Sequence, residues 1–379
     1  MTTLTNLQPV RATGSASLVP AKGRVLTGDR PTGKLHLGHY FGTLANRVRL
    51  QQAGHELIIV VADYQVVADR DHPGDLDSTV HDMVLDYLGC GLDPARTTIF
   101  VHSQIPELNQ LILPFLSLVS MGELSRNPTI KDEIRLADRG MVSGLMLTYP
   151  VHQAADVLFC KSTLVPVGRD QLPHLELTRS IARRFNDRYG AVFELPEGIL
   201  SQTPVLVGLD GQKMGKSRGN AINLDDTDDQ IVAKIRAART DGQRQISYQP
   251  RQRPEVATLL RLAALCRDTD PHRVAEEIGS RGAAALKQLV IESVIELLTP
   301  IRLRRADYER ADAHGILANG NSRARELAGR TLNEVRAAMN MSYGFIETPL
   351  LETPLLETPL LETPLLETPL LETPLQERR

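Results

Sequence analysis

Two short groups of basic residues lie far apart in this chain and share one chemistry. The first is His36-Leu37-Gly38-His39 and the second is Lys213-Met214-Gly215-Lys216-Ser217. Apolar residues predict a strand at 24–27 and a helix at 37–50, so the first group opens a strand–turn–helix unit. The amide hydrogens of a helix N-terminus are unpaired and bind phosphate. We expect the fold to bring the lysines of the second group close to these imidazoles. The two groups together then predict one ATP site.

The elements around the first group are suited to a ligand that lies close to the backbone. Residues 27–33 include two glycines and a proline, which permit a tight bend. Gly38 leaves room for adenine or ribose to lie against the backbone. Arg30 adds a cation that can pair with a phosphate. Taken alone, each group also fits a solvated surface turn, and it is their combination that favours a site.

The two groups resemble the HIGH and KMSKS signatures of class I aminoacyl-tRNA synthetases, with Gly215 where a serine is common. In that family the carboxylate of an amino acid attacks the α-phosphorus of ATP, so catalysis is positioning and charge stabilisation. Mg²⁺ accompanies the ATP. The resemblance implies four catalytic residues and three further ATP contacts: His36, His39, Lys213 and Lys216, then Gly38, Met214 and Ser217.

A third segment, Tyr149–Leu158, predicts the amino acid. We expect a loop that runs into a helix, with Asp156 bracketed by alanines and aliphatic residues. A carboxylate in such surroundings needs a hydrogen-bond donor, and an indole N–H would serve. The segment resembles tryptophanyl-tRNA synthetases, which implies that Asp156 faces the indole nitrogen and Tyr149 lies along the ring. The alternative is a carboxylate that interacts only with the dipole at a helix N-terminus.

A fourth segment, Val165–Asn186, matches the pattern PVGxDQxxHxExTRxxxxRFN of the same family. Gly168 follows a predicted buried strand, at the sheet edge where ligands bind. The resemblance implies that Gly168 and Asp170 face the nucleotide and that Gln171 holds the α-ammonium or carboxylate of the amino acid. Asp170 is also a candidate N-cap for a helix at 172–189.

One departure from the common pattern leaves open a second interpretation of the amino-acid substrate. Gln153 stands where many tryptophanyl-tRNA synthetases carry methionine, and a glutamine three residues before an aspartate is shared with tyrosyl-tRNA synthetases. In those enzymes both residues hold a phenol. The alanines at 154 and 155 and the stretch 166–186 favour tryptophan. A third possibility is a regulatory protein that retains the fold and charges no tRNA.

The order of elements predicts an α/β fold. Apolar runs at 57–62 and 98–101, with a helix around 80–88 between them, indicate a doubly wound parallel sheet of Rossmann-like type. Only helices are predicted after Ser217, at 226–239, 254–267 and a longer one around 286–301. The predicted domains are a disordered leader (1–23), a catalytic domain (24–217), a helical anticodon-binding domain with C-terminal helices (218–341) and a disordered tail (342–379).

Composition agrees with a soluble cytoplasmic enzyme. Of 379 residues, 42% are hydrophobic and 23% charged, and no long apolar span predicts a membrane helix. Cys90, Cys160 and Cys266 are isolated, so neither zinc nor an iron–sulfur cluster is predicted. The resemblance implies tRNA(Trp) as a partner and a homodimer.

Two further features are less specific. Eight arginines between 302 and 336 fit either RNA contact or ordinary helix surface, since acids are interleaved with them. Residues 346–375 repeat a Leu-Glu-Thr-Pro-Leu unit, with isoleucine opening the first. Proline at every fifth position blocks a continuous helix, so we expect an extended tail.

Overall fold

The computed structural model describes residues 22–69, 74–131, 143–168, 171–200, 206–210, 214–215 and 219–343. Four predicted site residues, Asp170, Lys213, Lys216 and Ser217, lie outside these ranges, as do the predicted leader up to residue 21 and the repeats. Contacts divide the chain into two units, 1–341 and 342–379, and every element named below belongs to the first. The boundary between a catalytic and a helical domain near residue 217 stays a prediction.

The centre of the first unit is a five-stranded sheet, in the order β3-β2-β1-β4-β5, whose strand pairs are all parallel. The chain builds the sheet outward from β1 to β3 and then returns to the other side of β1 with β4. The order therefore reverses between β1 and β4, as in doubly wound sheets. The prediction of a doubly wound parallel sheet is confirmed. The strands are β1 Arg24–Asp29, β2 Glu56–Val61, β3 Thr97–Val101, β4 Leu164–Val167 and β5 Glu197–Leu200.

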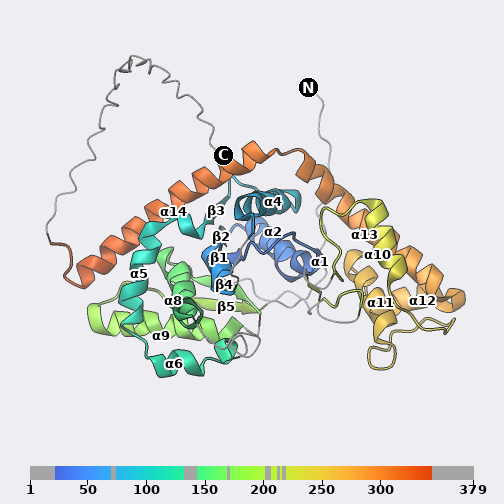
Figure 1. Ribbon diagram of the computed structural model, residues 1–379, viewed down its shortest axis with the longest axis horizontal. Helices are drawn as coiled ribbons and strands as arrows, with labels where there is room; N and C mark the ends of the chain where they lie inside the picture. The colour runs from blue at the N-terminus through green and yellow to red at the C-terminus, as the bar shows by residue number, and fades with distance from the viewer. Residues whose placement is uncertain are drawn as a thin grey trace, which may run out of the picture. The chain divides into compact units, whose positions relative to one another are not determined.

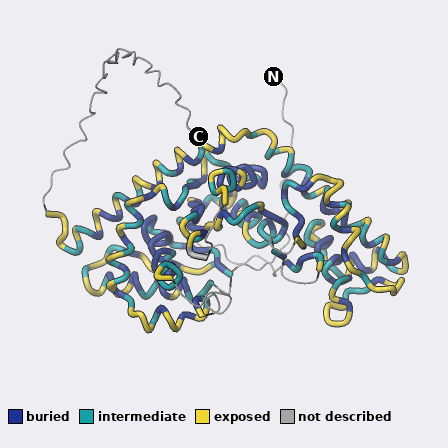
Figure 2. Tube along the Cα trace, in the orientation of Figure 1, coloured by how far each residue is buried: buried dark blue, intermediate teal, exposed yellow. Residues whose placement is uncertain are grey.

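Both faces of the sheet are covered, which explains why β2 reads as a continuous apolar run. Leu57 and Ile59 pack into one cluster with the helices that follow β1 and β2. Ile58 and Val60 point the other way, into a second cluster with α5, α8 and α9. Figures 1 and 2 show helices on both sides of buried central strands. The helices of this α/β layer are α3 Tyr64–Asp69, α4 Leu76–Gly89, α5 Pro106–Leu116, α6 Met121–Arg126, α8 Gly144–Phe159 and α9 Leu172–Tyr189.

The helix predicted at 37–50 is present but not uniform. It comprises α1 Leu37–His39, a π-helical segment η1 Tyr40–Leu44 and α2 Ala45–Gln52. Single π-helical turns within α-helices occur frequently at functional sites. This one directly follows the predicted histidine group.

After residue 226 only helices are found in the described part, as predicted. They are α10 Asp228–Ala237, α11 Pro254–Cys266, α12 Pro271–Ile278, α13 Gly282–Ala306 and α14 Arg310–Ala338, with short 3₁₀ turns at Gly279–Arg281 (η5) and, earlier in the chain, at His102–Gln104 (η2). The last of these helices, α14, returns to the sheet and lies along its edge strand, β3 (Figure 1). Within the described ranges, no helix combines the length and apolar character needed to cross a membrane.

Candidate active site

Two predicted site residues, Arg30 and Gly168, and one that was not predicted, His102, directly follow parallel strands on both sides of the point where the strand order reverses. Arg30 directly follows β1, Gly168 directly follows β4, and the turn η2 begins at His102, directly after β3. Open α/β sheets bind ligands in this crevice because the chain leaves adjacent strands in opposite directions. The fold therefore places the predicted nucleotide and amino-acid segments at one edge.

The two histidines of the first group cap their own helix. His36 Nδ1 accepts a hydrogen bond from the Gly38 amide at 3.1 Å, and the His36 amide donates to His39 Nδ1 at 3.1 Å. An imidazole nitrogen that accepts a hydrogen bond carries no proton. Each neutral ring therefore carries its proton on Nε2, the atom needed to donate to a phosphate oxygen.

The expectation that this helix offers unpaired amides to phosphate is wrong. Its first amides already have protein acceptors: Leu37 N donates to Ile222 O, Gly38 N to His36 Nδ1, and both His39 N and Tyr40 N to His36 O. The histidine side chain replaces the anion as the cap. Any phosphate contact at this position falls to the imidazole rings rather than to the backbone.

The segment after the second group is hydrogen-bonded to the first group. His36 and Asn223 form an antiparallel bridge, with Leu37 N donating to Ile222 O at 2.9 Å and Leu224 N to Leu35 O at 3.0 Å. A Cβ on Gly38 would lie 2.9 Å from His36 Nδ1 and 3.6 Å from Met214 Sδ. His36 occupies the space beside Gly38 and Met214 approaches it. Adenine or ribose therefore has no open space where a Cβ of residue 38 would lie. The role of Gly38 in ATP binding stays a prediction.

Asn220 anchors the described part of the second group, and sequence reasoning missed it. Its Oδ1 accepts from Gly215 N at 2.9 Å, and its Nδ2 donates to Asp210 Oδ1 at 2.7 Å. Met214 N donates to Leu206 O at 3.4 Å. The backbone around Met214 and Gly215 is thus held by one buried amide side chain between the two arms of the loop.

A buried charge network supports the end of β1. The Arg47 guanidinium, 1% exposed, lies 2.5 Å from Asp29 Oδ2, and Tyr87 Oη donates to the same oxygen at 2.7 Å. Burial by itself would raise the pKa of Asp29, but Arg47 outweighs it and holds that pKa below the ordinary value. The ionised pair ties the helix after the histidines to the strand before them. The sequence signal was a charged residue on the inner face of that helix.

Two of the predicted tryptophan contacts are joined through a residue that was not predicted. His174 Nδ1 lies 2.9 Å from Gln153 Oε1, and His174 Nε2 lies 3.2 Å from Tyr149 Oη. Because an amide oxygen only accepts, His174 carries its proton on Nδ1 and accepts from the tyrosine hydroxyl. The bridge fixes the orientation of Gln153 and Tyr149. Gln171 is the N-cap of α9, although its side chain makes no capping hydrogen bond.

The segment around Asp156 differs from the prediction in two ways. There is no loop before it, because α8 begins at Gly144 and contains Pro150. Asp156 is 2% exposed, as expected, but His102 Nε2 lies 2.9 Å from its Oδ1. The carboxylate thus has a partner within the protein, from a turn far away in sequence.

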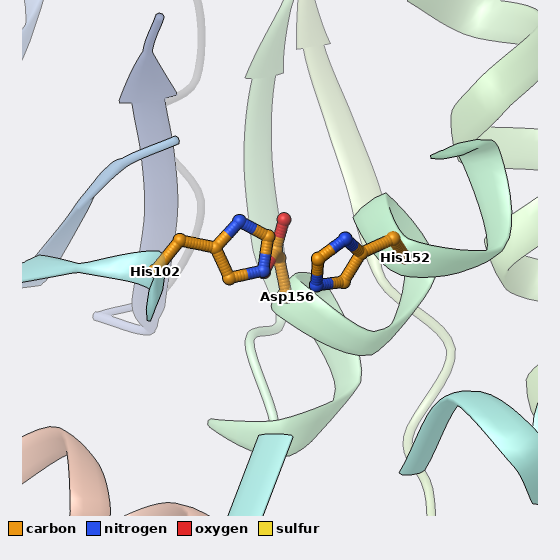
Figure 3. A group of neighbouring side chains, drawn as sticks. All are labelled: His102, His152 and Asp156. Carbon is orange, nitrogen blue, oxygen red and sulfur yellow. The ribbon is translucent and has the colours of Figure 1, made fainter. Parts of the chain in front are cut away.

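A second histidine completes this cluster (Figure 3). The His152 ring stacks on the His102 ring with centroids 3.8 Å apart and a tilt of 36°. Burial lowers the pKa of His152 to about 4, although Asp156 acts in the opposite direction, so its ring is neutral at pH 7. Donor atoms of the three side chains lie within 4.8 Å of one another, and these are the described residues that could hold a metal ion.

Comparison with known proteins identifies the family. Residues 21–299 match the model of tRNA synthetases class I (W and Y). The chain belongs to this family. The tryptophan–tRNA ligase of Clostridium longisporum is 41% identical over 335 residues, covering 85% of this chain and 98% of the relative. That of Treponema pallidum (strain Nichols) is 40% identical and covers 84% and 97%.

A solved structure of the same family agrees with the fold. Tryptophanyl-tRNA synthetase from Campylobacter jejuni, crystallised with ADP and tryptophan, superposes on this synthetase with a TM-score of 0.74 at 27% identity. The match covers 84% of this chain and 99% of that one. The α/β sheet with following helices is therefore the arrangement of a class I synthetase.

Most of the arginines between 302 and 336 in this synthetase make contacts within the protein. Arg305 Nε lies 2.8 Å from Asp86 Oδ1 and Arg304 Nε donates to Gly89 O at 2.8 Å, so both connect α13 to α4. The others with acidic or amide partners are Arg302 with Asp228, Arg310 with Asp77, Arg325 with Glu107, Arg330 with Glu326 and Arg336 with Gln110. These contacts favour helix surface over RNA contact.

Proposed function

We propose that this synthetase is a tryptophan–tRNA ligase. It activates tryptophan with ATP to give tryptophanyl-adenylate and pyrophosphate, then transfers the tryptophanyl group to the 3′-terminal adenosine of tRNA(Trp). The family model covers both tryptophan and tyrosine enzymes, whereas the curated relatives described above are tryptophan–tRNA ligases at about 40% identity. The single observation on which the assignment of tryptophan as the substrate rests is the burial of the Asp156 carboxylate at the carboxyl edge of the sheet.

The histidine geometry supports a role in adenylate formation. With Nδ1 of His36 and His39 accepting from backbone amides, the proton of each neutral ring lies on Nε2. In our proposal these groups donate to phosphate oxygens as the α-phosphorus becomes pentacoordinate, and Arg30 pairs with a phosphate. Lys213 and Lys216 neutralise the departing pyrophosphate, with Mg²⁺ held by the nucleotide. Such groups act by charge stabilisation rather than covalent chemistry.

The remaining contacts are proposed from the resemblance of these segments to the family pattern. We propose that Met214 and Ser217 contact ATP with Gly38, and that Gly168 and Asp170 face the nucleotide at the end of β4. Tyr149, Gln153 and Asp156 line the indole, and Gln171 holds the amino-acid backbone. The His174 bridge between Tyr149 and Gln153 supports this, because it sets both side chains before the substrate arrives. We further propose a cytoplasmic homodimer that binds tRNA(Trp).

A buried carboxylate also explains selectivity against phenylalanine. A substrate without a polar hydrogen would leave Asp156 desolvated and without the hydrogen bond that the indole N–H supplies, a penalty much larger than that of a missing methylene.

The test is ATP–pyrophosphate exchange with tryptophan, tyrosine and phenylalanine in parallel. We expect exchange with tryptophan only. Asp156→Asn should reduce kcat/KM for tryptophan on the order of 100-fold, since a charged hydrogen-bond acceptor is lost. Glu176→Gln, on an exposed position of α9, is the matched control and should change nothing.

Two results would contradict the proposal. Exchange driven by tyrosine alone would mean that Gln153 and Asp156 bind a phenol. The absence of exchange with any amino acid, in a folded protein, would favour a regulatory role.

A further inference from the structure

The contact between His102 and Asp156 requires a proton. Both side chains are buried, 0% and 2% exposed, and their Nε2 and Oδ1 atoms are 2.9 Å apart. A deprotonated ring nitrogen and a carboxylate oxygen at that separation would repel each other through their lone pairs. The neutral tautomer of His102 with its proton on Nε2 avoids this repulsion.

His152 cannot supply that proton. Its Nε2 lies 3.1 Å from Asn109 Oδ1, an acceptor, so its own proton is used there. Its ring faces that of His102, and two protonated rings in contact would repel each other. His152 therefore acts as a neutral face against which the His102 ring is held, and the centroid of the Tyr64 ring lies 5.7 Å from that of His102.

His102 and Asp156 lie close together, but their polar atoms are not fully hydrogen-bonded. Neither ring nitrogen of His102, nor Asp156 Oδ1, has a well-aligned hydrogen-bond partner in the described part of the chain. Buried polar atoms almost always have such partners, so the exceptions here require an explanation. A ligand that brings an N–H to this carboxylate would satisfy it and draw it into alignment.

We propose that His102 is a positioning residue that holds the Asp156 carboxylate where it can accept the indole N–H, and thereby sets the preference for tryptophan over ring analogues without that hydrogen. The inference rests on the proposed function. It assigns a role to a residue that contacts Asp156 from the end of β3, while Asp156 itself projects from α8 (Figure 3). The neighbouring carboxylate, Asp63, is engaged elsewhere, because it accepts from the amides of Tyr64 and Ser103 at 3.0 Å.

Discrimination between two substrates tests this role. The analogue 3-(3-benzothienyl)-alanine replaces the indole N–H by sulfur and keeps the ring shape. The measured quantity is the ratio of kcat/KM for tryptophan to kcat/KM for the analogue in pyrophosphate exchange. His102→Asn, whose amide is too short to reach Asp156, should lower the ratio about tenfold, mainly through tryptophan. His102→Gln extends an amide to the Nε2 position and should keep most of the ratio.

The matched control is His81→Asn. His81 is also buried and stacks on another histidine, His314, but it lies on α4 outside the site. The same substitution there should leave the ratio unchanged. If His102→Asn lowers kcat/KM for both substrates equally, His102 has a merely structural role and the proposal is wrong.

A double substitution keeps the test usable if the single variant unfolds. Asp156→Asn with His102→Asn removes the buried charge together with its partner. Its ratio should equal that of Asp156→Asn alone, because His102 acts only through Asp156; a further loss would overturn the proposal. Loss of discrimination on treatment with 1,10-phenanthroline would also overturn it, by showing that the cluster holds a metal ion.

Direct binding separates this inference from the proposed function. The chain contains no tryptophan, so the fluorescence of bound tryptophan can be followed without a protein background. Failure of the wild-type protein both to bind tryptophan and to catalyse exchange would count against the proposed function. Tight binding that His102→Asn leaves unchanged would count against the role of His102 alone.

Discussion

Burial and hydrogen bonding together fix the protonation of the histidines at this site. His36 and His39 carry the proton on Nε2 because backbone amides occupy Nδ1, whereas His174 carries it on Nδ1 because Gln153 accepts there. The same residue type thus caps a helix, bridges Tyr149 and Gln153, and contacts a carboxylate. Each role depends on which neighbour each ring nitrogen meets.

His152 predicts a specific acid sensitivity. Its pKa is about 4 in the folded protein, below the ordinary 6.5, so the unfolded chain binds the extra proton first. This contribution to stability is present above pH 6.5 and is lost as the pH falls toward 4, at about 1.4 kcal/mol per pKa unit. His152→Gln, which keeps an amide for Asn109, should make the free energy of unfolding less dependent on pH between 7 and 4.5. Urea titrations of both proteins at several pH values measure it, and parallel pH profiles would contradict the assignment.

The sequence indicates that Asp156 is buried with a partner, but it does not indicate that the partner is His102. A carboxylate among alanines and aliphatic residues signals burial with a partner, and Asp156 is buried with one. Its partner, His102, directly follows β3, whereas Asp156 lies on α8, and no local pattern connects the two. The same applies to Arg47, whose acceptor Asp29 lies across the bend. Pairings between distant segments depend on topology, which only the fold provides.

At the level of elements, α14 protects the open edge of the sheet. Unpaired strand edges promote association with other chains, and proteins cover them. Asn321 Oδ1 accepts from Val101 N at 2.9 Å, and the helix approaches so closely that a Cβ on Gly320 would lie 1.8 Å from Ile99 O. Gly320 is therefore required by contact rather than by backbone angle.

Two glycines of α14 allow a matched comparison. Gly320→Ala should destabilise the protein by about 2 kcal/mol or more, because a backbone carbonyl must move. A Cβ on Gly329 would meet no neighbouring element within 4 Å, so Gly329→Ala should stabilise by up to about 1 kcal/mol through helix propensity. Thermal unfolding of the two variants measures whether each substitution lowers or raises the stability of the protein. Equal effects would show that α14 does not pack on β3 as described.

Strands β1 to β4 and the helices at 37–50, around 80–88 and at 172–189 were predictable because long apolar runs and short connections leave few alternatives, whereas β5 was not predicted. The run at 57–62 corresponds to β2, and the helix predicted at 172–189 has the same bounds as α9. In contrast, α14 was not predicted as a sheet cover. Its inner face consists largely of small residues such as Ala324 and Ala328, so its apolar periodicity is weak.

At the level of the whole molecule, arginines of α13 connect the helices after residue 226 to the α/β layer. Arg305 pairs with Asp86, which is 4% exposed, and also approaches Asp82 at 3.2 Å. Burial raises the pKa of Asp86 to about 6, although Arg305 acts in the opposite direction. Burial of the Asp86 carboxylate is thus costly. Among the described residues, Arg305 is the cation that forms an ion pair with it.

Replacement of Arg305 therefore has a pH-dependent effect. Arg305→Met keeps the aliphatic stem and leaves Asp86 unpaired, which should cost about 3 kcal/mol at pH 8, where the carboxylate is ionised. Because the folded pKa lies above the unfolded one and rises further in the variant, protonation relieves the penalty, so the loss should shrink at pH 5. Arg330→Met, which removes an exposed pair with Glu326, is the control and should change stability by less than about 0.5 kcal/mol.

The same variant decides between the two interpretations of the arginines. If Arg305 connects elements within the protein, the KM for tRNA(Trp) in aminoacylation at pH 8 and at a temperature below the unfolding transition should match that of the wild type. A phosphate contact would instead raise this KM and weaken its dependence on salt, because one counterion fewer is released on binding. A raised KM with unchanged stability would assign Arg305 to the RNA surface and contradict its role as the link between α13 and α4.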